Sequence, residues 1–195
     1  MTIETAAVSS RVVAEYDAIP SVFEVRSILT ARRSDGGHDR YVLSERIVAS
    51  PYVKDYDAVS ERPREWPERF DTSSWEVFLA RVGTRAVAGA AVAVRTRGLD
   101  LLEGRDDLAL LWDIRVAPDV RRHGVGRALF QAAEQWALTQ DCCELKIETQ
   151  DVNVAACRFY AAMGCELRTV RKRAYTVCPG EAQYLWYKRL LRLQS

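Results

Sequence analysis

A chain of 195 residues, 48% of them hydrophobic, is long enough to bury the core of one domain. Its 28 basic and 27 acidic residues give a formal net charge of +1, so overall charge favours neither nucleic acid nor a membrane surface as a partner. No apolar run approaches the roughly 18 residues of a membrane span, and the first residues do not read as a secretory signal. Five cysteines and two histidines fit neither a disulfide framework nor a metal site. We expect a cytoplasmic protein with reduced thiols and no bound metal.

The first third of the chain gives weak structural signals. Alternating apolar residues predict strands over residues 22–29 and 41–48, with a polar, glycine-containing loop over 31–40 between them. Residues 50–74 are rich in proline, tryptophan and charge, and no element is assigned to them.

The middle of the chain gives stronger signals. Strands over residues 75–82 and 85–95 flank Gly83-Thr84, a dipeptide typical of a hairpin turn, and a polar connection over 97–107 follows. Residues 109–116 predict an apolar strand, central in a sheet. A helix is then predicted from about residue 124 to 139. Four residues at helical spacing give it one apolar face: Val125, Leu129, Ala132 and Trp136.

The last quarter alternates between strands and one helix. Residues 145–149 predict a strand, and Asn153 and Gly164 suit the two ends of a helix. Residues 165–175 and 184–190 predict two antiparallel strands that end the fold. The alternation predicts one α/β domain over residues 1–195.

Two glycines one residue apart, Gly124 and Gly126, stand where the apolar strand meets the helix. A helix start presents backbone N–H groups without partners, and the helix dipole favours negative charge there. Glycine lets a phosphate approach the backbone closely, so the loop predicts a phosphate site. Arg127 and Ala128 exclude a Walker loop, and Leu129 stands where a dinucleotide fingerprint has its third glycine.

The pattern Arg121-x-x-Gly124-x-Gly126, after a strand ending in Val116-x-Pro118, resembles the acyl-CoA pyrophosphate signature of the GNAT superfamily of N-acetyltransferases. Residues 145–150, followed by Asn153-x-x-Ala156-x-x-Phe159-Tyr160, resemble the second half of the same core. The resemblance implies a mixed, mostly antiparallel sheet with splayed central strands flanked by helices, a signature core over about residues 108–190, and acetyl-CoA bound between the strands.

By the same resemblance, one set of residues would contact the cofactor. They are Ile114, Arg115, Val116, Arg121, Arg122, His123, Gly124, Val125, Gly126, Arg127, Asn153, Ala156 and Tyr160. Asn153 would hydrogen-bond the cofactor arm and Tyr160 would face the thioester sulfur. The structural alternatives are that Asn153 only caps a helix and that Tyr160 only packs in the core.

The expected chemistry needs an acid and a base. An alkylammonium has a pKa near 10.4, so a group must accept its proton before it can attack a thioester. Tyr160 is the candidate acid for the departing thiolate, and a backbone N–H near Val116 could stabilise the oxyanion. Asp113 and Glu148 compete for the role of base. We favour Glu148, because Asp113 suits a structural role in its strand.

Several segments also resemble streptothricin acetyltransferases, which acetylate an amine of a cationic antibiotic. The matching segments are residues 52–57, 102–107, 111–114, 147–150 and 185–188. This resemblance implies antibiotic resistance through a small cationic substrate, attacked directly in a ternary complex. The carboxylates that could pair with such a substrate are Asp55, Asp57, Glu148 and Glu181. Trp66 and Trp75 could line an acceptor pocket or pack in the core.

Other functions remain open from the sequence. The chain could acetylate a protein N-terminus or a lysine, or it could bind an acyl-CoA without catalysis. No nucleic-acid or membrane partner is expected. The C-terminal strands could support a homodimer.

Overall fold

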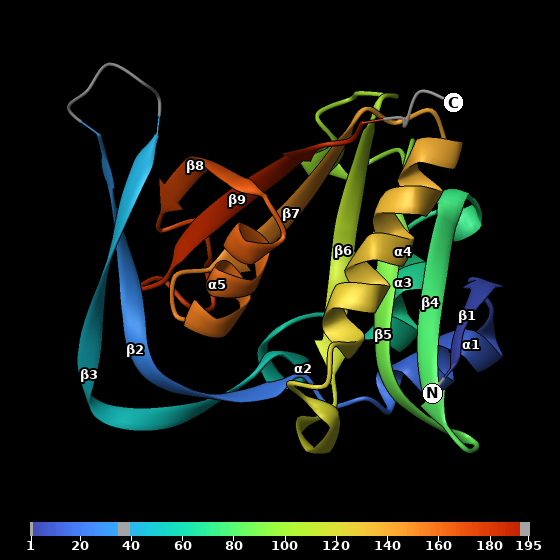
Figure 1. The fold of residues 1–195 in the computed structure, drawn as a ribbon, viewed down its shortest axis with the longest axis horizontal. Helices are drawn as coiled ribbons and strands as arrows, with labels where there is room; N and C mark the ends of the chain where they lie inside the picture. The colour runs from blue at the N-terminus through green and yellow to red at the C-terminus, as the bar shows by residue number, and fades with distance from the viewer. Residues whose placement is uncertain (1, 35–39, 192–195) are drawn as a thin grey trace. The chain divides into compact units, whose positions relative to one another are not determined.

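The computed structural model describes residues 2–34 and 40–191, drawn as a ribbon in Figure 1. The chain divides into two units, which we describe separately. The first consists of the described residues within Met1–Val22, Tyr56–Lys146 and Arg189–Ser195, and the second of those within Phe23–Asp55 and Ile147–Lys188. No helix in the described ranges is long and apolar enough to cross a membrane.

The first unit is built on antiparallel strands. Strand β4 (Trp75–Val82) pairs with β1 (Thr2–Ala7) on one side and with β5 (Arg85–Ala93) on the other, and β5 pairs with β6 (Leu108–Val116). A two-residue turn joins β4 to β5, and its Gly83 has a φ of +60°, which glycine adopts without strain.

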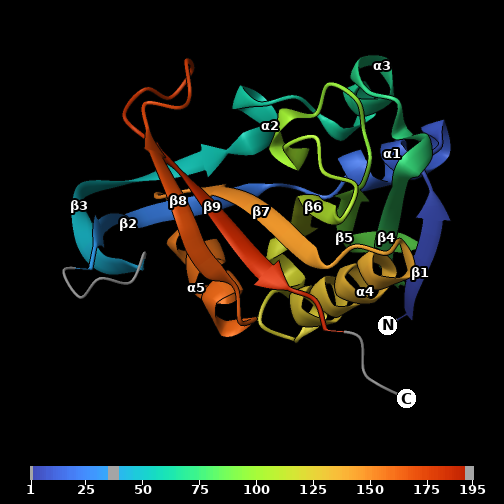
Figure 2. The same cartoon turned by 90° about the horizontal axis from the view of Figure 1, so that it is seen from above.

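Helices cover both faces of this sheet. Helix α4 (Val125–Thr139) packs on one face, against β4, β5 and β6. On the other face lie α1 (Ser10–Asp17) and α3 (Trp66–Arg69), as the view in Figure 2 shows. The short helix α2 (Tyr56–Val59) begins the segment that leads to α3.

Helix α1 lies unusually close to β5 because residue 89 has no side chain. A Cβ atom placed on Gly89 would stand 2.5 Å from Cε2 of Tyr16, which is closer than real Cβ contacts come. The buried Tyr16 ring therefore occupies the space that glycine leaves on the strand.

The second unit combines a strand ribbon with a sheet and one helix. Strands β2 (Val22–Arg33) and β3 (Tyr41–Asp55) form the ribbon, and strand order β7-β9-β8 forms the sheet. The sheet strands are Glu144–Gln150 for β7, Glu166–Lys172 for β8 and Ala182–Arg189 for β9, and the helix is α5, Val154–Ala162. The backbone of Leu29 joins the ribbon to the sheet, since its N–H donates to Asp151 O and its carbonyl accepts from the Tyr184 hydroxyl.

Most predicted elements are confirmed, with corrections at their ends. The strand predicted over 22–29 runs to Arg33 and the strand predicted over 41–48 runs to Asp55. The predicted loop over 31–40 is therefore wrong at 31–33, and its residues 35–39 lie outside the described residues. The strand predicted over 165–175 ends at Lys172. Its antiparallel pairing with the last strand is confirmed.

The buried face of α4 differs slightly from the predicted one. Val125 and Leu129 are buried as predicted, whereas Ala132 and Trp136 are half-buried. The other buried positions are Phe130, Ala133 and Ala137. These buried positions form one stripe along the helix, on the side that contacts β4, β5 and β6.

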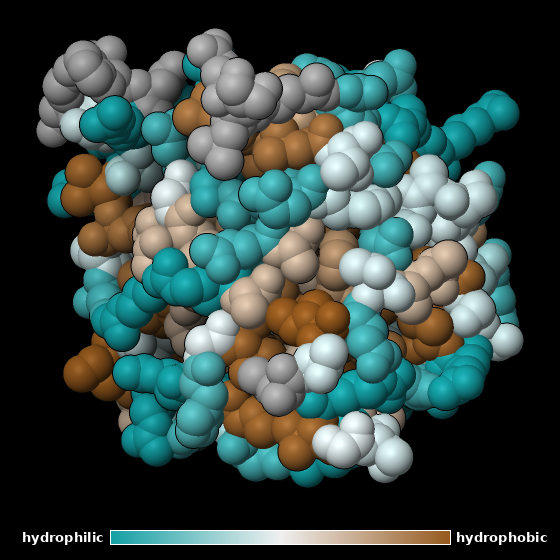
Figure 3. All heavy atoms as spheres, turned by 45° about the vertical axis from the view of Figure 1, so that its right-hand side comes forward, coloured by the Kyte–Doolittle hydropathy of each residue, from teal (hydrophilic) through white to brown (hydrophobic). Residues whose placement is uncertain are grey.

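The surface carries scattered apolar groups. On the face drawn in Figure 3, hydrophobic patches are separated by hydrophilic atoms. The large hydrophobic residues that are most exposed come from several elements, and they include Val42, Ile47, Val53, Val177 and Leu191.

Candidate functional site

The loop before α4 has the geometry of an anion site. Gly124 is the N-cap of α4 in a left-handed conformation with φ of +81°, and a Cβ there would meet no atom within 4 Å. Arg122 is also left-handed, with φ of +70°, an uncommon conformation for a residue with a side chain. The first N–H groups of α4 have no acceptor within the helix. Exposed Arg122, His123 and Arg127 surround this helix start with basic side chains.

Arg121 supports the shape of this loop. Its Nε donates to Val116 O at 2.9 Å and its Nη2 donates to Val22 O at 2.7 Å. The guanidinium thus ties the end of β6 to the segment after α1. A direct contact between Arg121 and a phosphate stays a prediction.

A β-bulge on β6 presents Trp112. The register with β5 pairs Asp113 with Ala91 and Leu111 with Val92, so Trp112 is the extra residue. Its half-buried ring lies 5.5 Å from the ring of Phe70 and packs edge-on against it. The same aromatic cluster contains Trp66 and Trp75, which are 2% and 3% exposed. Both side chains therefore pack in the core.

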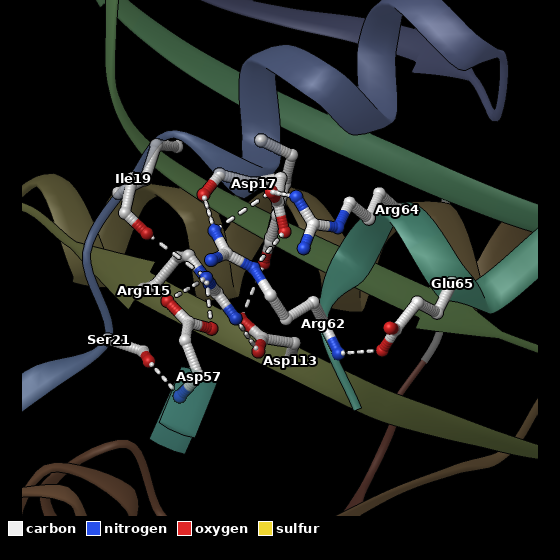
Figure 4. A network of polar contacts seen from close by, with 10 residues as sticks. Asp17, Ile19, Ser21, Asp57, Arg62, Arg64, Glu65, Asp113 and Arg115 are labelled. Carbon is white, nitrogen blue, oxygen red and sulfur yellow. Dashed lines mark hydrogen bonds and ion pairs between the residues drawn. The ribbon is translucent and has the colours of Figure 1, made fainter. Parts of the chain in front are cut away.

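Arg115 lies at the centre of the polar network in Figure 4. Its guanidinium, 4% exposed, binds both oxygens of Asp113, with Nε–Oδ1 at 3.0 Å and Nη2–Oδ2 at 2.7 Å. Its Nη1 donates to Asp57 Oδ1 at 3.1 Å and to Ile19 O at 3.0 Å. The Tyr16 hydroxyl donates to Asp113 Oδ1 at 2.7 Å.

A second ion pair extends this network towards α3. Arg62 binds the carboxylate of Asp17 with two hydrogen bonds of 3.0 and 2.9 Å, and Figure 4 shows Arg64 beside the same carboxylate. Burial lowers the pKa of Arg115, because it disfavours the charged form. The carboxylates of Asp113 and Asp57 have the larger effect, and they raise that pKa above its ordinary range. The network links α1, α2 and β6 through the hydrogen bonds of ionised side chains.

Three residues of this network were predicted from the sequence to contact the cofactor or the substrate. Both oxygens of Asp113 have partners, and the side chain of Arg115 is turned into the core. This geometry favours a structural role for Asp113, and its role as a base stays a prediction. Asp57, expected as a contact for a cationic substrate, is engaged with Arg115.

In the second unit, α5 positions two predicted residues. The side chain of Asn153 accepts from Ala156 N at 3.1 Å, so the predicted helix cap is confirmed. Tyr160 lies two turns later, 5% exposed, with its ring 6.4 Å from the ring of Trp186. Burial raises the pKa of the Cys157 thiol on the same helix to about 12, which makes it a poor nucleophile.

Glu148 on β7 is a half-buried carboxylate of this unit. Burial raises its pKa above the ordinary value, although hydrogen bonds from Tyr175 and Gln183 act in the opposite direction. The Tyr175 hydroxyl donates to Glu148 Oε1. Tyr175 lies in the connection between β8 and β9, and no spacing in the sequence links it to Glu148.

Glu181 makes a buried ion pair with Lys54 of β3. The Nζ–Oε1 distance is 2.6 Å, and the Lys54 side chain is 6% exposed. Lys54 Nζ also lies 3.1 Å from Cys178 Sγ. Glu181 and Glu148 thus belong to one unit, whereas Asp113 and Asp57 belong to the other.

The described residues hold no group of three or more His, Cys, Asp or Glu side chains arranged for a metal ion. All five cysteines have free thiols. The predicted cofactor contacts of Ile114, Val116, Val125, Gly126 and Ala156 stay predictions.

Comparison with known proteins decides the family. The sequence profile of the Acetyltransferase (GNAT) family matches residues 44–165, more than half of the chain. The chain belongs to this family. The recognition made from the glycine loop is confirmed, and with it the enzyme class and the mixed, mostly antiparallel α/β fold.

Relatives within the GNAT family include two streptothricin acetyltransferases. Streptothricin acetyltransferase A of Bacillus subtilis is 42% identical over 81 residues, covering 40% of this chain and 47% of that protein. The match thus spans about half the length of that relative. Streptothricin acetyltransferase of Escherichia coli is 29% identical over 168 residues, covering 85% of this chain and 84% of the other.

A solved structure shares the fold over nearly the full length. It is a Bacillus anthracis protein described as a streptothricin acetyltransferase and solved in complex with acetyl coenzyme A. The TM-score is 0.76 at 21% identity, with 96% of this chain and 99% of that chain covered.

Proposed function

We propose that this chain is an acetyl-CoA-dependent N-acetyltransferase whose acceptor is a small cationic amine, of the kind found in streptothricin-like antibiotics. The observation that carries the proposal is the start of α4, where Gly124 is left-handed and open to solvent beside unpartnered N–H groups. Family membership and the names of the two bacterial relatives support the same reading.

The loop before α4 would hold the pyrophosphate of acetyl-CoA. The space around Gly124 admits phosphate oxygens to within hydrogen-bond distance of the backbone, and basic Arg122 and Arg127 add favourable charge. On α5, Asn153 would serve both as the helix cap and as a partner of the cofactor arm. When bound, acetyl-CoA supplies a thioester carbonyl for attack by the amine.

Glu148 would accept the proton of the attacking ammonium, directly or through a water molecule. Its burial raises its pKa, and a carboxylate with a raised pKa is a stronger base at neutral pH. The hydrogen bond from Tyr175 would fix the carboxylate in one orientation. Tyr175 is therefore a positioning residue in this mechanism.

Tyr160 would donate a proton to the departing thiolate. Its place on α5, one turn from Cys157 and buried beside Trp186, restricts the ring to a defined orientation. Asp113 takes no step in this mechanism. Its ion pair with Arg115 would instead keep the strand before the phosphate loop in place.

A thiol-release assay with acetyl-CoA tests the proposal on streptothricin, aminoglycosides, polyamines, amino acids and short peptides. Rapid turnover with streptothricin and little with peptides is the expected result. Turnover on peptides alone would replace the acceptor with a protein N-terminus or lysine. Tight binding of acetyl-CoA without turnover on any amine would make the chain a non-catalytic acyl-CoA-binding module.

A further inference from the structure

Two of the five cysteines are within reach of a small solute. Three are buried, whereas Cys143 is exposed and Cys178 is partly exposed. The Cys143 thiol donates to Asp107 Oδ2 at 3.0 Å, and this hydrogen bond raises the pKa of the thiol. The thiolate is the form of cysteine that attacks an oxidant. The carboxylate therefore protects Cys143, although its side chain is the more exposed of the two.

Cys178 faces a cation instead of a carboxylate. Lys54 Nζ donates to Cys178 Sγ across 3.1 Å, a distance that leaves no room for another atom between them. A neighbouring ammonium stabilises negative charge on a sulfur, which favours the reaction of that sulfur with a peroxide. Both residues belong to the second unit, with Lys54 on β3 and Cys178 in the connection between β8 and β9.

The Lys54 amine is held beside this sulfur and beside a base. Its side chain is 6% exposed, and Nζ lies 2.6 Å from Glu181 Oε1. Burial lowers the pKa of Lys54, but its hydrogen bonds to Glu181 and Cys178 have the larger effect, and the pKa is raised. The resting amine is thus an ammonium, and it can act as a nucleophile only when the carboxylate takes a proton from it. Oxidation of the thiol weakens the sulfur as an acceptor for that ammonium, which leaves Glu181 as its main partner.

We propose that Cys178 and Lys54 form an oxidative modification site, at which a hydroperoxide converts the contact between them into a covalent N–S bond. The peroxide first transfers one oxygen to Sγ and leaves as water, so the sulfur loses two electrons and becomes a sulfenic acid. Nζ then attacks Sγ, the N–S bond forms and the S–O bond breaks. The ammonium gives up two protons, of which one leaves with the hydroxyl group as water and the other passes to Glu181.

This bond would join β3 covalently to the connection between β8 and β9. The sulfenic acid of a cysteine is known to condense with a nearby nitrogen in this way, and thiols reverse the product. The inference concerns oxidation of the chain itself, so it does not depend on the proposed acetyltransferase function.

Peptide mapping of the wild type after treatment with hydrogen peroxide tests the inference. Trypsin does not cleave after a lysine whose amine carries another bond, so residues 47–64 and 174–188 should leave the digest as one joined species. Its mass should be about 2 Da below the sum of the two reduced peptides, because two hydrogen atoms are lost. Dithiothreitol should separate the two peptides again.

Any other fate of Cys178 would overturn the inference. A gain of about 16 or 32 Da on Cys178 without joined peptides would mean simple oxidation of the sulfur. A joined species about 14 Da heavier than the reduced peptides would mean that one peroxide oxygen remains between nitrogen and sulfur. A thiol that stays unchanged while Cys143 is oxidised would show that the cation does not activate Cys178.

Lys54→Arg separates the role of the amine from the role of the charge. Arginine keeps the positive charge beside Glu181, but its guanidinium stays protonated and cannot form the bond. We expect Cys178 in this variant to gain about 16 or 32 Da under the same treatment. Joined peptides in Lys54→Arg would overturn the inference.

Cys143→Ser is the matched control for Cys178→Ser, because it makes the same change at the other cysteine that a solute can reach. The joined species should persist in Cys143→Ser and disappear in Cys178→Ser, and the reverse pattern would overturn the inference. Since the peptide map of the wild type identifies the bond directly, the inference can be decided even where a variant fails to fold.

Discussion

Arg115 and Asp113, two residues apart on β6, form a two-point ion pair in which the guanidinium is 4% exposed. Residues i and i+2 lie on the same face of a strand, so the pair forms within the strand itself. Asp57 and the carbonyl of Ile19 complete the guanidinium's partners from other elements. The pair therefore links the strand before the phosphate loop to α1 and α2.

Removing this cation should destabilise the fold strongly. Arg115→Met leaves the Asp113 and Asp57 carboxylates without their buried partner, and we expect unfolding free energy to fall by about 3–5 kcal/mol. Urea denaturation followed by circular dichroism measures the change. Arg85→Met, which breaks the exposed pair with Asp119, should cost under about 1 kcal/mol. Similar losses in the two variants would contradict the role given to the network.

Gly124→Asp should abolish the binding of acetyl-CoA. The substitution forces a side chain into a left-handed conformation and adds negative charge where phosphate is expected, so the dissociation constant should rise at least about 100-fold, or ~2.7 kcal/mol. Isothermal titration calorimetry provides the measurement. Gly98→Asp is the control, since Gly98 has a φ of +80° and open space around it. Equal affinity in wild type and Gly124→Asp would refute the phosphate site, and Gly126→Asp offers an independent repeat.

Tyr160→Phe should separate catalysis from binding. If the hydroxyl protonates the thiolate, kcat should fall by about 10²–10⁴-fold while the affinity for acetyl-CoA stays nearly unchanged. The ring contact with Trp186 survives the substitution, so packing should change little. Thiol release gives kcat and calorimetry gives the affinity. An unchanged kcat would show that Tyr160 has only a packing role.

Tyr175→Phe should move the acid limb of the pH–rate profile. Glu148 must be ionised to act as a base, so kcat/KM falls as pH drops through its raised pKa. The Tyr175 hydroxyl stabilises the ionised carboxylate and lowers that pKa. Its removal should shift the limb to higher pH, with little change in rate well above it. A limb that stays in place, with a lower rate at every pH, would assign Tyr175 to another step.

The fold was predictable wherever local patterns were strong. Strand β4 has the bounds expected from its alternation, and the helix cap by Asn153 follows from residue type alone. The first 21 residues gave no such pattern, and β1 and α1 were missed. Helix α1 spans only eight residues, and its burial depends on Tyr16 fitting against β5, which is a long-range packing effect.

Of the candidate site, the sequence predicted the phosphate loop but not the partners of the polar side chains. The Gly124 loop is a local motif, so spacing was enough to find it. The partners of Glu148 and Asp113 come from far along the chain: Tyr175 is 27 residues after the first and Tyr16 is 97 residues before the second. Hydrophobic periodicity indicates local secondary structure, and it does not predict contacts between distant residues. For the same reason, the sequence alone could not decide between Asp113 and Glu148 as the base.

The close approach of Tyr16 to Gly89 has an evolutionary consequence. A Cβ at residue 89 would overlap the Tyr16 ring, and the Tyr16 hydroxyl is one of the partners of Asp113. Homologues that replace Gly89 with a larger residue must therefore carry a smaller one at position 16, and they lose a donor to the carboxylate as they do so. The two positions should covary across the family, and position 113 should change type in the lineages where that exchange has occurred.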